Sequence, residues 1–369
     1  MDLEKIVIPE AAFNPALGLL AQLLGLRKVE IQTALDSKHN PGYQTAFVPK
    51  GKSRRGKRRL DIPPEPLKIV QKVLLERCLY HIVPVVPGWA AMTGFFKGAS
   101  IRRNVESHLR GNAFFQFDLK DAFPTVTSEM VRKTLEFLFS EKNVRRMFRF
   151  KDVRWFYFRY IRQQRRKKGG SQQLLPFLII DPLTILWAFR EIIIWLTIHE
   201  DRLPQGAPTS PFLLNLVLTA FEVPAKIKAF LENYGRYRVT IYADDITIST
   251  LETYIPEEVR EGVIQVVETE TPFTVNPKKT RYTERRQRSP HITGLALADG
   301  RHGLDNITVP KEFQRRARNL IHRAIFEPSL RAEALGIVAF LLDVYCFPDF
   351  LPNQIKRPYE KLLAVIKEE

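Results

Sequence analysis

Val239-Thr-Ile-Tyr-Ala-Asp244-Asp245-Ile-Thr-Ile-Ser-Thr250 is the stretch that decides the fold of this chain. β-Branched and aromatic residues flank two adjacent carboxylates, which predicts two short strands with the acids at a hairpin turn. Acids buried at a strand junction are costly unless a positive charge neutralises them, and carboxylate oxygens suit Mg²⁺. The alternative is a solvated surface turn, because Asp is a common turn residue.

The charge of the chain favours a polyanionic partner. Its 369 residues include 57 Lys and Arg against 40 Asp and Glu, which gives a formal net charge of +17. A chain this basic usually binds nucleic acid, and an anionic membrane is the competing partner. The hydrophobic content of 45% is ample for a core in one large or two ordinary domains.

Secretion and membrane insertion are not expected. The first residues lack a basic segment followed by an apolar run, so no signal peptide is predicted. The longest apolar run, 174–198, is interrupted by prolines and charges and is therefore expected to form core segments. Cys78 and Cys346 are far apart, which predicts neither a zinc site nor a disulfide and fits a reducing, cytoplasmic location.

A second segment with functional acids runs from Phe114 to Val126. An apolar strand leads into Asp118, and Asp121 and Phe123 follow. An acid at the C-terminal end of a buried strand can reach a metal held by a neighbouring hairpin. The alternative is an ordinary strand end followed by a helix, for which Thr127 is a candidate N-cap.

Two basic segments are candidates for phosphate contact. Residues 50–59 form a Gly-punctuated basic loop or hairpin, which either grips phosphates or is a solvated turn. Residues 143–170 interleave basic and aromatic side chains, a mixture that suits base stacking with phosphate contact. An amphipathic helix with arginines lying over a core face is the alternative. The candidate nucleic-acid contacts in this block are Arg154, Trp155, Arg159 and Arg162.

The remaining segments supply helices and one further loop. Helices are predicted within residues 1–40, over 67–80, over 212–218 and from Pro310 to the end. In the loop 203–211, Gly206 permits close backbone approach to a ligand and Gln205 offers an amide beside it.

In their order along the chain, these motifs closely resemble those of bacterial reverse transcriptases, particularly the retron group. The resemblance covers residues from about 50 to 345. It rests on Arg58-Arg-Leu60 with Pro63 and 67–71, on 94–101 with Asn104 and His108, and on 117–123, 203–211, 242–245, 276–281 and 292–295. Each motif alone is weak, but seven in sequence are strong evidence.

The resemblance implies an α+β right-hand polymerase with fingers, an antiparallel-sheet palm and a helical thumb. Residues 1–110 would be N-terminal helices and fingers, 111–300 the palm with a basic-aromatic insertion near 143–198, and 301–369 the thumb. Asp118, Asp244 and Asp245 would be the catalytic triad. They would hold two Mg²⁺ ions, or Mn²⁺ as a substitute, with the carbonyl of Leu119 as an additional ligand.

The same resemblance implies roles for substrate-binding and nucleic-acid-binding residues. Arg58, with Lys52 or Arg59, would hold the triphosphate of the dNTP, and Lys279 would lie near the phosphates. Ala122 and Phe123 would lie beside the sugar, where Phe123 would exclude a 2′-hydroxyl. Gln205 would contact the nucleotide or template, Gly294 the primer end, and Arg315 and Arg318 the RNA template or RNA/DNA hybrid.

Several functions stay open at this point. The leading one is a retron-like RNA-directed DNA polymerase that copies a structured, cognate non-coding RNA in anti-phage defence, with an effector protein or homo-oligomer as partner and no membrane. A defence-associated enzyme of the abortive-infection type, with protein-primed or untemplated DNA synthesis, is the nearest alternative. A catalytically inactive RNA-binding scaffold and a viral-type RNA polymerase are less favoured, since the three acids and Phe123 are all present.

Overall fold

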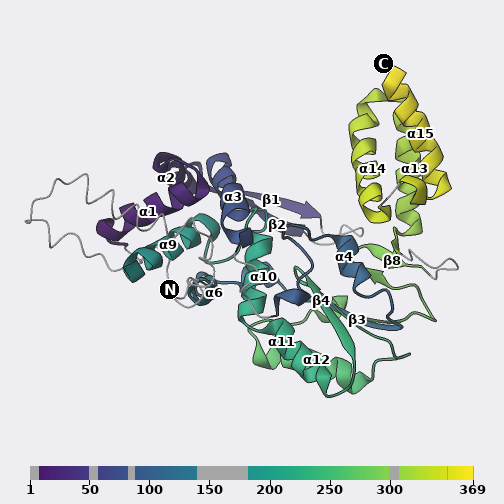
Figure 1. Ribbon diagram of the computed structural model, residues 1–369, viewed down its shortest axis with the longest axis horizontal. Helices are drawn as coiled ribbons and strands as arrows, with labels where there is room; N and C mark the ends of the chain where they lie inside the picture. Colours follow the sequence, from purple (N-terminus) through teal and green to yellow (C-terminus); the bar gives the residue numbers. More distant parts are fainter. Residues whose placement is uncertain are drawn as a thin grey trace, which may run out of the picture. The chain divides into compact units, whose positions relative to one another are not determined.

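The computed structural model describes residues 8–49, 57–81, 88–138, 182–298, 307–346 and 348–368 (Figure 1). Helices and antiparallel strands are mixed along this chain, as the sequence predicted. The chain divides into two compact units, each built from separated segments. The first unit comprises Met1–Ala90, Lys120–Ala225 and Thr269–Phe273, and the second comprises Ala91–Leu119, Lys226–Glu268 and Thr274–Glu369.

The first unit is a helical body that carries one β-hairpin. Its helices are α1 (Glu10–Leu24), α2 (Lys28–Ser37), α3 (Glu65–Arg77), α5 (Ala122–Thr125), α6 (Ser128–Leu138), α9 (Pro182–Thr197) and α10 (Ser210–Ala220). α1 packs on α9, α2 packs on α3, and α6 contacts both α9 and α10. The hairpin pairs β1 (Gln44–Pro49) with β2 (Lys57–Ile62) in antiparallel register. The helices expected within 1–40, over 67–80 and over 212–218 are therefore confirmed.

Local signals in the sequence explain where several helices begin. Glu30 accepts a hydrogen bond of 2.7 Å from the backbone N–H of Arg27, which closes the first turn of α2. The Thr127 hydroxyl accepts from the backbone N–H of Met130 at 3.3 Å, as predicted for the start of α6. In α9, six of the apolar residues expected to form core segments are buried: Ala188, Phe189, Ile192, Ile193, Ile194 and Leu196.

The second unit contains a four-stranded antiparallel sheet. Its strands are β3 (Ala113–Asp118), β4 (Tyr237–Tyr242), β5 (Asp245–Thr250) and β6 (Arg281–Glu284), in the order β4-β5-β3-β6. The β4–β5 hairpin is the one predicted around the paired acids. Helices α11 (Val223–Glu232) and α12 (Glu257–Glu270) pack closely, because Gly262 lies directly against the ring of Phe230.

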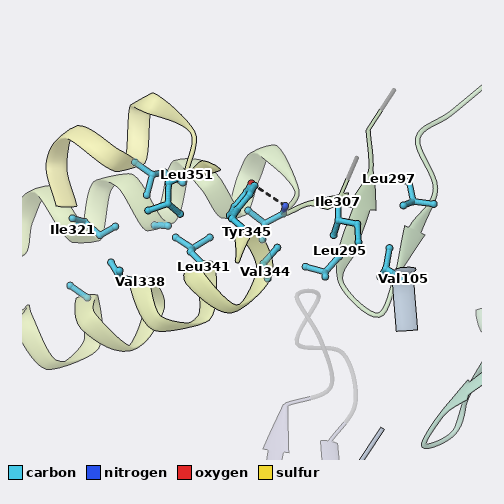
Figure 2. Close-up of a cluster of buried hydrophobic side chains, with 14 of the residues drawn as sticks. Val105, Leu295, Leu297, Ile307, Ile321, Val338, Leu341, Val344, Tyr345 and Leu351 are labelled. Carbon is cyan, nitrogen blue, oxygen red and sulfur yellow. Dashed lines mark hydrogen bonds between the residues drawn. The ribbon is translucent and has the colours of Figure 1, made fainter. Parts of the chain in front are cut away.

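A separate core joins the small sheet to the C-terminal helices. The elements are α4 (Ile101–Glu106), the antiparallel strands β7 (His291–Ile292), β8 (Leu295–Leu297) and β9 (Ile307–Thr308), and the helices α13 (Lys311–Phe326), α14 (Arg331–Tyr345) and α15 (Asn353–Glu368). Figure 2 shows Leu341, Val344 and Tyr345 between the helices and the sheet residues Leu295 and Ile307. The helical C-terminal segment predicted from Pro310 onward is confirmed.

Two polar side chains tie that core together. The Tyr345 hydroxyl lies 2.7 Å from the Thr308 hydroxyl and accepts a 3.4 Å hydrogen bond from the backbone N–H of Val309 (Figure 2). Buried Asn104 on α4 accepts from the Thr93 hydroxyl at 3.0 Å and donates to the Thr293 hydroxyl at 3.3 Å. Satisfied buried polar groups of this kind specify one packing arrangement.

His108 is a buried polar link between α4 and the four-stranded sheet. Its Nδ1 lies 2.7 Å from the Ser249 hydroxyl and its Nε2 lies 2.7 Å from the Thr240 hydroxyl. Burial, with a smaller contribution from the nearby charge of Arg238, lowers the pKa of His108 to about 3. The imidazole is therefore neutral at neutral pH.

Acidification should destabilise the second unit through His108. Because the folded-state pKa of about 3 lies below the ordinary value of 6.5, protonation favours the unfolded chain, and stability present above pH 6.5 is lost as the pH falls. Between pH 7 and pH 5 we expect a loss of about 2 kcal/mol in the free energy of unfolding. Urea unfolding of wild type and His108→Gln at both pH values measures it. An equal pH dependence in the two proteins would contradict the assignment.

Candidate active site

Antiparallel pairing brings the three predicted acids to one end of the second unit's sheet. Asp118, the last residue of β3, lies directly opposite Asp245, the first residue of β5. The backbone N–H of Leu119 donates to the carbonyl of Asp244 at 2.9 Å. The backbone therefore places Asp118, from a distant part of the sequence, beside the Asp244-Asp245 pair.

The turn between β4 and β5 is tight. Ala243 has φ of 56°, in the left-handed region, so the chain reverses within Ala243 and Asp244. Tyr242 precedes the turn, and Gly94 lies so close to its ring that an added Cβ would stand 2.8 Å from it. Thr93, which precedes the 94–101 motif, donates its N–H to the carbonyl of Ile241 at 2.9 Å, so Thr93 and Gly94 both contact the strand that leads into the acids.

Lys279 supplies a positive charge at the same end of the sheet. Its ammonium group forms an ion pair with the Asp118 carboxylate. The segment that carries Lys279 is positioned by the backbone N–H of Asn276, which donates to the Asp118 carbonyl at 2.8 Å. Asn276 also caps the short turn Pro277–Lys279 through its side chain, which accepts from the backbone N–H of Lys278. The predicted basic turn is thereby placed against the acids.

Burial changes the acidity of one of these carboxyl groups. Desolvation raises the pKa of Asp245, and the positive charge of Arg281 on β6 opposes part of that shift. Arg281 ends the 276–281 motif, but the sequence did not predict it as a site residue. Its role depends on β6 pairing with β3, which the sequence pattern around 281 does not reveal.

The donor set suits a divalent metal, although the side chains do not form a ready-made cage. In the part of the chain that the structure describes, no three Asp, Glu, His or Cys side chains converge closely enough to hold an ion. The backbone nevertheless places three carboxylates at one sheet end, the hard oxygen ligands that Mg²⁺ and Mn²⁺ prefer. The Lys279 ammonium stands beside Asp118 as the local neutralising charge.

Most of the residues predicted to contact the nucleotide belong to the first unit. In that unit, Arg58 and Arg59 have different surroundings. Arg59 donates to Asp61 at 2.6 Å and to Glu200 at 3.0 Å, and Arg202 pairs with the same Glu200. Arg58 is exposed on β2 and has no ion-pair partner among the described residues. Arg58 is therefore available to a triphosphate, whereas Arg59 is already engaged in holding the hairpin.

The Gln205-Gly206 loop is attached to the same hairpin. The carbonyl of Gln205 accepts the backbone N–H of Asp61 at 2.7 Å. Gly206 has φ of 127°, and a Cβ at this position would stand 3.0 Å from the Asp61 carbonyl oxygen. The glycine thus permits a close approach to the protein's own β2 strand; the sequence had predicted a close approach to a ligand.

Ala122 and Phe123 open the short helix α5. Asp121 has φ of 46° and its carbonyl accepts both the N–H and the hydroxyl of Thr125, which turns the chain sharply after β3. Ala122 is buried and Phe123 is partly exposed. Phe123, Gln205 and Arg58 all belong to the first unit, and the acids with Lys279 belong to the second.

The predicted nucleic-acid contacts divide into described and undescribed residues. Gly294, with φ of 85°, forms the turn between β7 and β8. Arg315 and Arg318 are exposed and three residues apart on α13, so they share a face of that helix. The remaining candidates lie outside the described residues: Lys52, Arg154, Trp155, Arg159, Arg162 and the rest of the basic-aromatic block.

Comparison with known proteins gives consistent relatives. The chain is 28% identical over 318 residues to the retron Mx162 reverse transcriptase of Myxococcus xanthus, covering 81% of this chain and 57% of that protein. It is 24% identical over 303 residues to the retron Ec86 reverse transcriptase of Escherichia coli, covering 82% of this chain and 76% of that protein. The chain is thus similar to retron reverse transcriptases over most of its length.

The chain spans less than two thirds of the length of the two Myxococcus xanthus relatives. It covers 60% of the retron Mx65 reverse transcriptase, to which it is 27% identical over 81% of its own length. No protein-family model matches the chain. Among solved structures, the TM-score is 0.45 to the RNA-dependent RNA polymerase of a human picobirnavirus, with 12% identity over 89% of this chain and 57% of that one. It is 0.42 to Candida albicans telomerase, with 11% identity over 88% and 54%.

Among the residues that the structure describes, no helix is long and apolar enough to cross a bilayer.

Two glycines with the same φ test the contact between the Gln205-Gly206 loop and the β1–β2 hairpin. Gly206 and Gly235 both have φ of 127°, but only Gly206 faces a backbone atom within 4 Å. Gly206→Ala should therefore cost about 1–3 kcal/mol more than Gly235→Ala, because both bear the torsional strain and only one adds a clash. Chemical unfolding of the two variants measures the difference. Equal losses would show that the approach of Asp61 is not restrictive.

Proposed function

We propose that the chain is an RNA-directed DNA polymerase of the retron type. The observation that carries the proposal is the β3–β5 register, which sets Asp118 opposite Asp245 and beside Asp244 in a chain whose relatives are retron reverse transcriptases. Asp118, Asp244 and Asp245 are the proposed catalytic residues. The cofactors are divalent ions, two Mg²⁺ or Mn²⁺ in their place.

The three acids would bind the metal ions, and the ions would in turn position the reacting groups. When bound, the ions lower the pKa of the attacking hydroxyl and stabilise charge on the leaving pyrophosphate. Desolvation raises the pKa of the partly buried Asp245 carboxyl, and neighbouring positive charge favours its ionised form. Arg281 supplies part of that charge, and bound cations supply the rest.

The residues predicted to bind the nucleotide keep those roles in this proposal. Arg58 would bind the triphosphate, and Lys279, which pairs with Asp118, would lie near the phosphates. Ala122 and Phe123 line the sugar site, where the bulk of Phe123 excludes a 2′-hydroxyl and so selects dNTPs. Gln205 would contact the incoming nucleotide or the template through its amide, and the carbonyl of Leu119 would be an additional metal ligand.

The nucleic acid lies on the C-terminal part of the chain and the basic block. Gly294 contacts the primer end, and Arg315 and Arg318 contact backbone phosphates of the RNA template or RNA/DNA hybrid. Arg154, Trp155, Arg159 and Arg162 contribute stacking and phosphate contacts to the cognate RNA. The template is a structured non-coding RNA, the setting is the cytoplasm, and the biological role is anti-phage defence with an effector protein or a second copy of the chain.

Substitution of the acids tests the catalytic assignment. Asp118→Asn, Asp244→Asn and Asp245→Asn should each lower dNTP incorporation on a primed RNA template by about 10²–10³-fold or more, because metal-borne charge stabilisation is worth several kcal/mol. The exposed acid Asp343→Asn is the matched control and should keep full activity. Normal polymerisation by Asp245→Asn would refute the assignment, and preferential incorporation of NTPs would point instead to an RNA polymerase.

Lys279 provides a test that does not depend on turnover. Removing its charge in Lys279→Met frees the Asp118 carboxylate, so Mn²⁺ should bind the nucleotide-free chain up to about fivefold more tightly, the scale of a partly exposed ion pair. Electron paramagnetic resonance titration of Mn²⁺ measures this. Lys278→Met, at the neighbouring exposed lysine, is the control and should bind Mn²⁺ like wild type. Weaker Mn²⁺ binding by Lys279→Met would contradict competition at Asp118.

A further inference from the structure

A basic cavity lies at the end of the second unit's sheet that is remote from the acids. Its volume is about 560 Å³, and its lining comes from the start of β4, the end of β5 and the segment that follows α4. The strand register places Thr250 opposite both Ala113 and Tyr237, whereas Asp245 stands at the other end of the same strand. At about 3.3 Å per residue, the two ends are roughly 17 Å apart.

Three arginines give this cavity its charge. Arg110, Arg236 and Arg238 line it, all are exposed, and none has a carboxylate partner among the residues described. Arg238 is the second residue of β4, an edge strand, and Arg236 immediately precedes that strand. The one carboxylate in the lining, Glu106, is already paired with Arg102 at 2.8 Å. Glu252, whose charge acts on Tyr237, is a further carboxylate nearby, and the lining itself carries more positive than negative charge.

Exposed apolar side chains adjoin the arginines. Tyr237 lines the cavity and is partly exposed. Leu251, in the same lining, is 59% exposed. Tyr254 is 58% exposed, and burial, the charge of Glu252 and the nearby Tyr254 together raise the pKa of Tyr237. Planar guanidinium groups beside exposed tyrosine rings match the phosphates and base faces of a single strand, since every base offers a stacking surface.

The cavity is built on a rigid base. Asn112 donates its backbone N–H to the Thr250 carbonyl at 2.8 Å and its side-chain amide to the Leu251 carbonyl at 2.6 Å. The Thr250 hydroxyl donates to the carbonyl of Arg236 at 3.2 Å. Below them, buried His108 is hydrogen-bonded to Ser249, itself a lining residue. The arginines thus extend from a fixed framework, which lowers the cost of ordering them around a ligand.

We propose that this arginine cavity, lined by Arg110, Arg236 and Arg238, binds single-stranded RNA through its backbone phosphates, with a base stacked on Tyr237 or Tyr254. The inference rests on the proposed function, because it assigns the cavity to a part of the RNA that is not being copied. A nucleotide at the acids and a nucleotide in the cavity are too far apart to form one base pair with each other. The cavity holds RNA to the enzyme while synthesis proceeds at the other end of the sheet.

Photo-crosslinking tests the site directly. The probe is a single-stranded RNA of about 20 nucleotides that carries 4-thiouridine, a length chosen to exceed the span of one such binding groove. We expect crosslinked peptides from residues 234–254, reduced about tenfold in Arg236→Gln/Arg238→Gln. Lys72→Gln/Lys133→Gln removes the same charge from exposed positions on α3 and α6 and should crosslink like wild type. Arg110→Gln alone provides an independent variant with a smaller loss.

Salt dependence provides the second readout. Loss of two phosphate contacts should reduce the slope of log affinity against log salt concentration by about 1.4 for single-stranded RNA, whereas the lysine control leaves the slope unchanged. Extension of a short, pre-annealed RNA/DNA primer–template by the arginine variant should equal that of wild type. If wild type does not polymerise but the crosslinks persist, the proposed function fails and the cavity assignment stands.

Other outcomes would overturn the cavity assignment. Crosslinks that map only outside residues 234–254, or that fall equally in the arginine and lysine variants, would remove the evidence for a specific site. Stronger binding of single-stranded DNA of the same sequence, or displacement of the RNA by polyglutamate at lower concentration than by unlabelled RNA, would assign the cavity to another ligand. Matching urea midpoints for all variants exclude unfolding as the cause of a loss.

Discussion

The antiparallel pairing of β3 with β5 is the interaction on which the rest of the structure depends. Its register sets Asp118 against Asp245 and, five residues along, Ala113 against Thr250. A shift by one residue would turn every side chain of β3 to the opposite face and separate the acids. Phe114 and Phe117 lie on opposite faces of β3 and are both fully buried, so slippage would disrupt packing on both sides of the sheet.

The two ends of this sheet carry opposite charge. Carboxylates collect where β3 ends and β5 begins, and arginines collect where β4 begins and β5 ends. Lys279 and Arg281 moderate the acidic end, the first by an ion pair with Asp118 and the second by its field at Asp245. A strand of six residues thereby separates a site suited to cations from a site suited to phosphates.

Local patterns predicted much of the secondary structure because they depend on near neighbours. The alternating apolar residues around the paired acids predicted the β4–β5 hairpin, and Thr127 indicated the start of α6. Distinguishing Arg58 from Arg59 was beyond such patterns, since the partner of Arg59 is Glu200, far along the chain. Gly206 was likewise recognised as a point of close approach, but the approaching group, Asp61, became clear only from the folded chain.

The sequence alone determined the residue types that chemistry requires, their order and the strands and helices that carry them, since propensities and turn preferences act over a few residues. The ordered motifs also identified the retron relatives. Only the tertiary structure decided which distant residues meet: Asp118 with the hairpin acids, Lys279 with Asp118, and three arginines around one cavity. The physical reason is that sheet register and long-range ion pairs are set by burial of the whole core, which no local window of sequence contains.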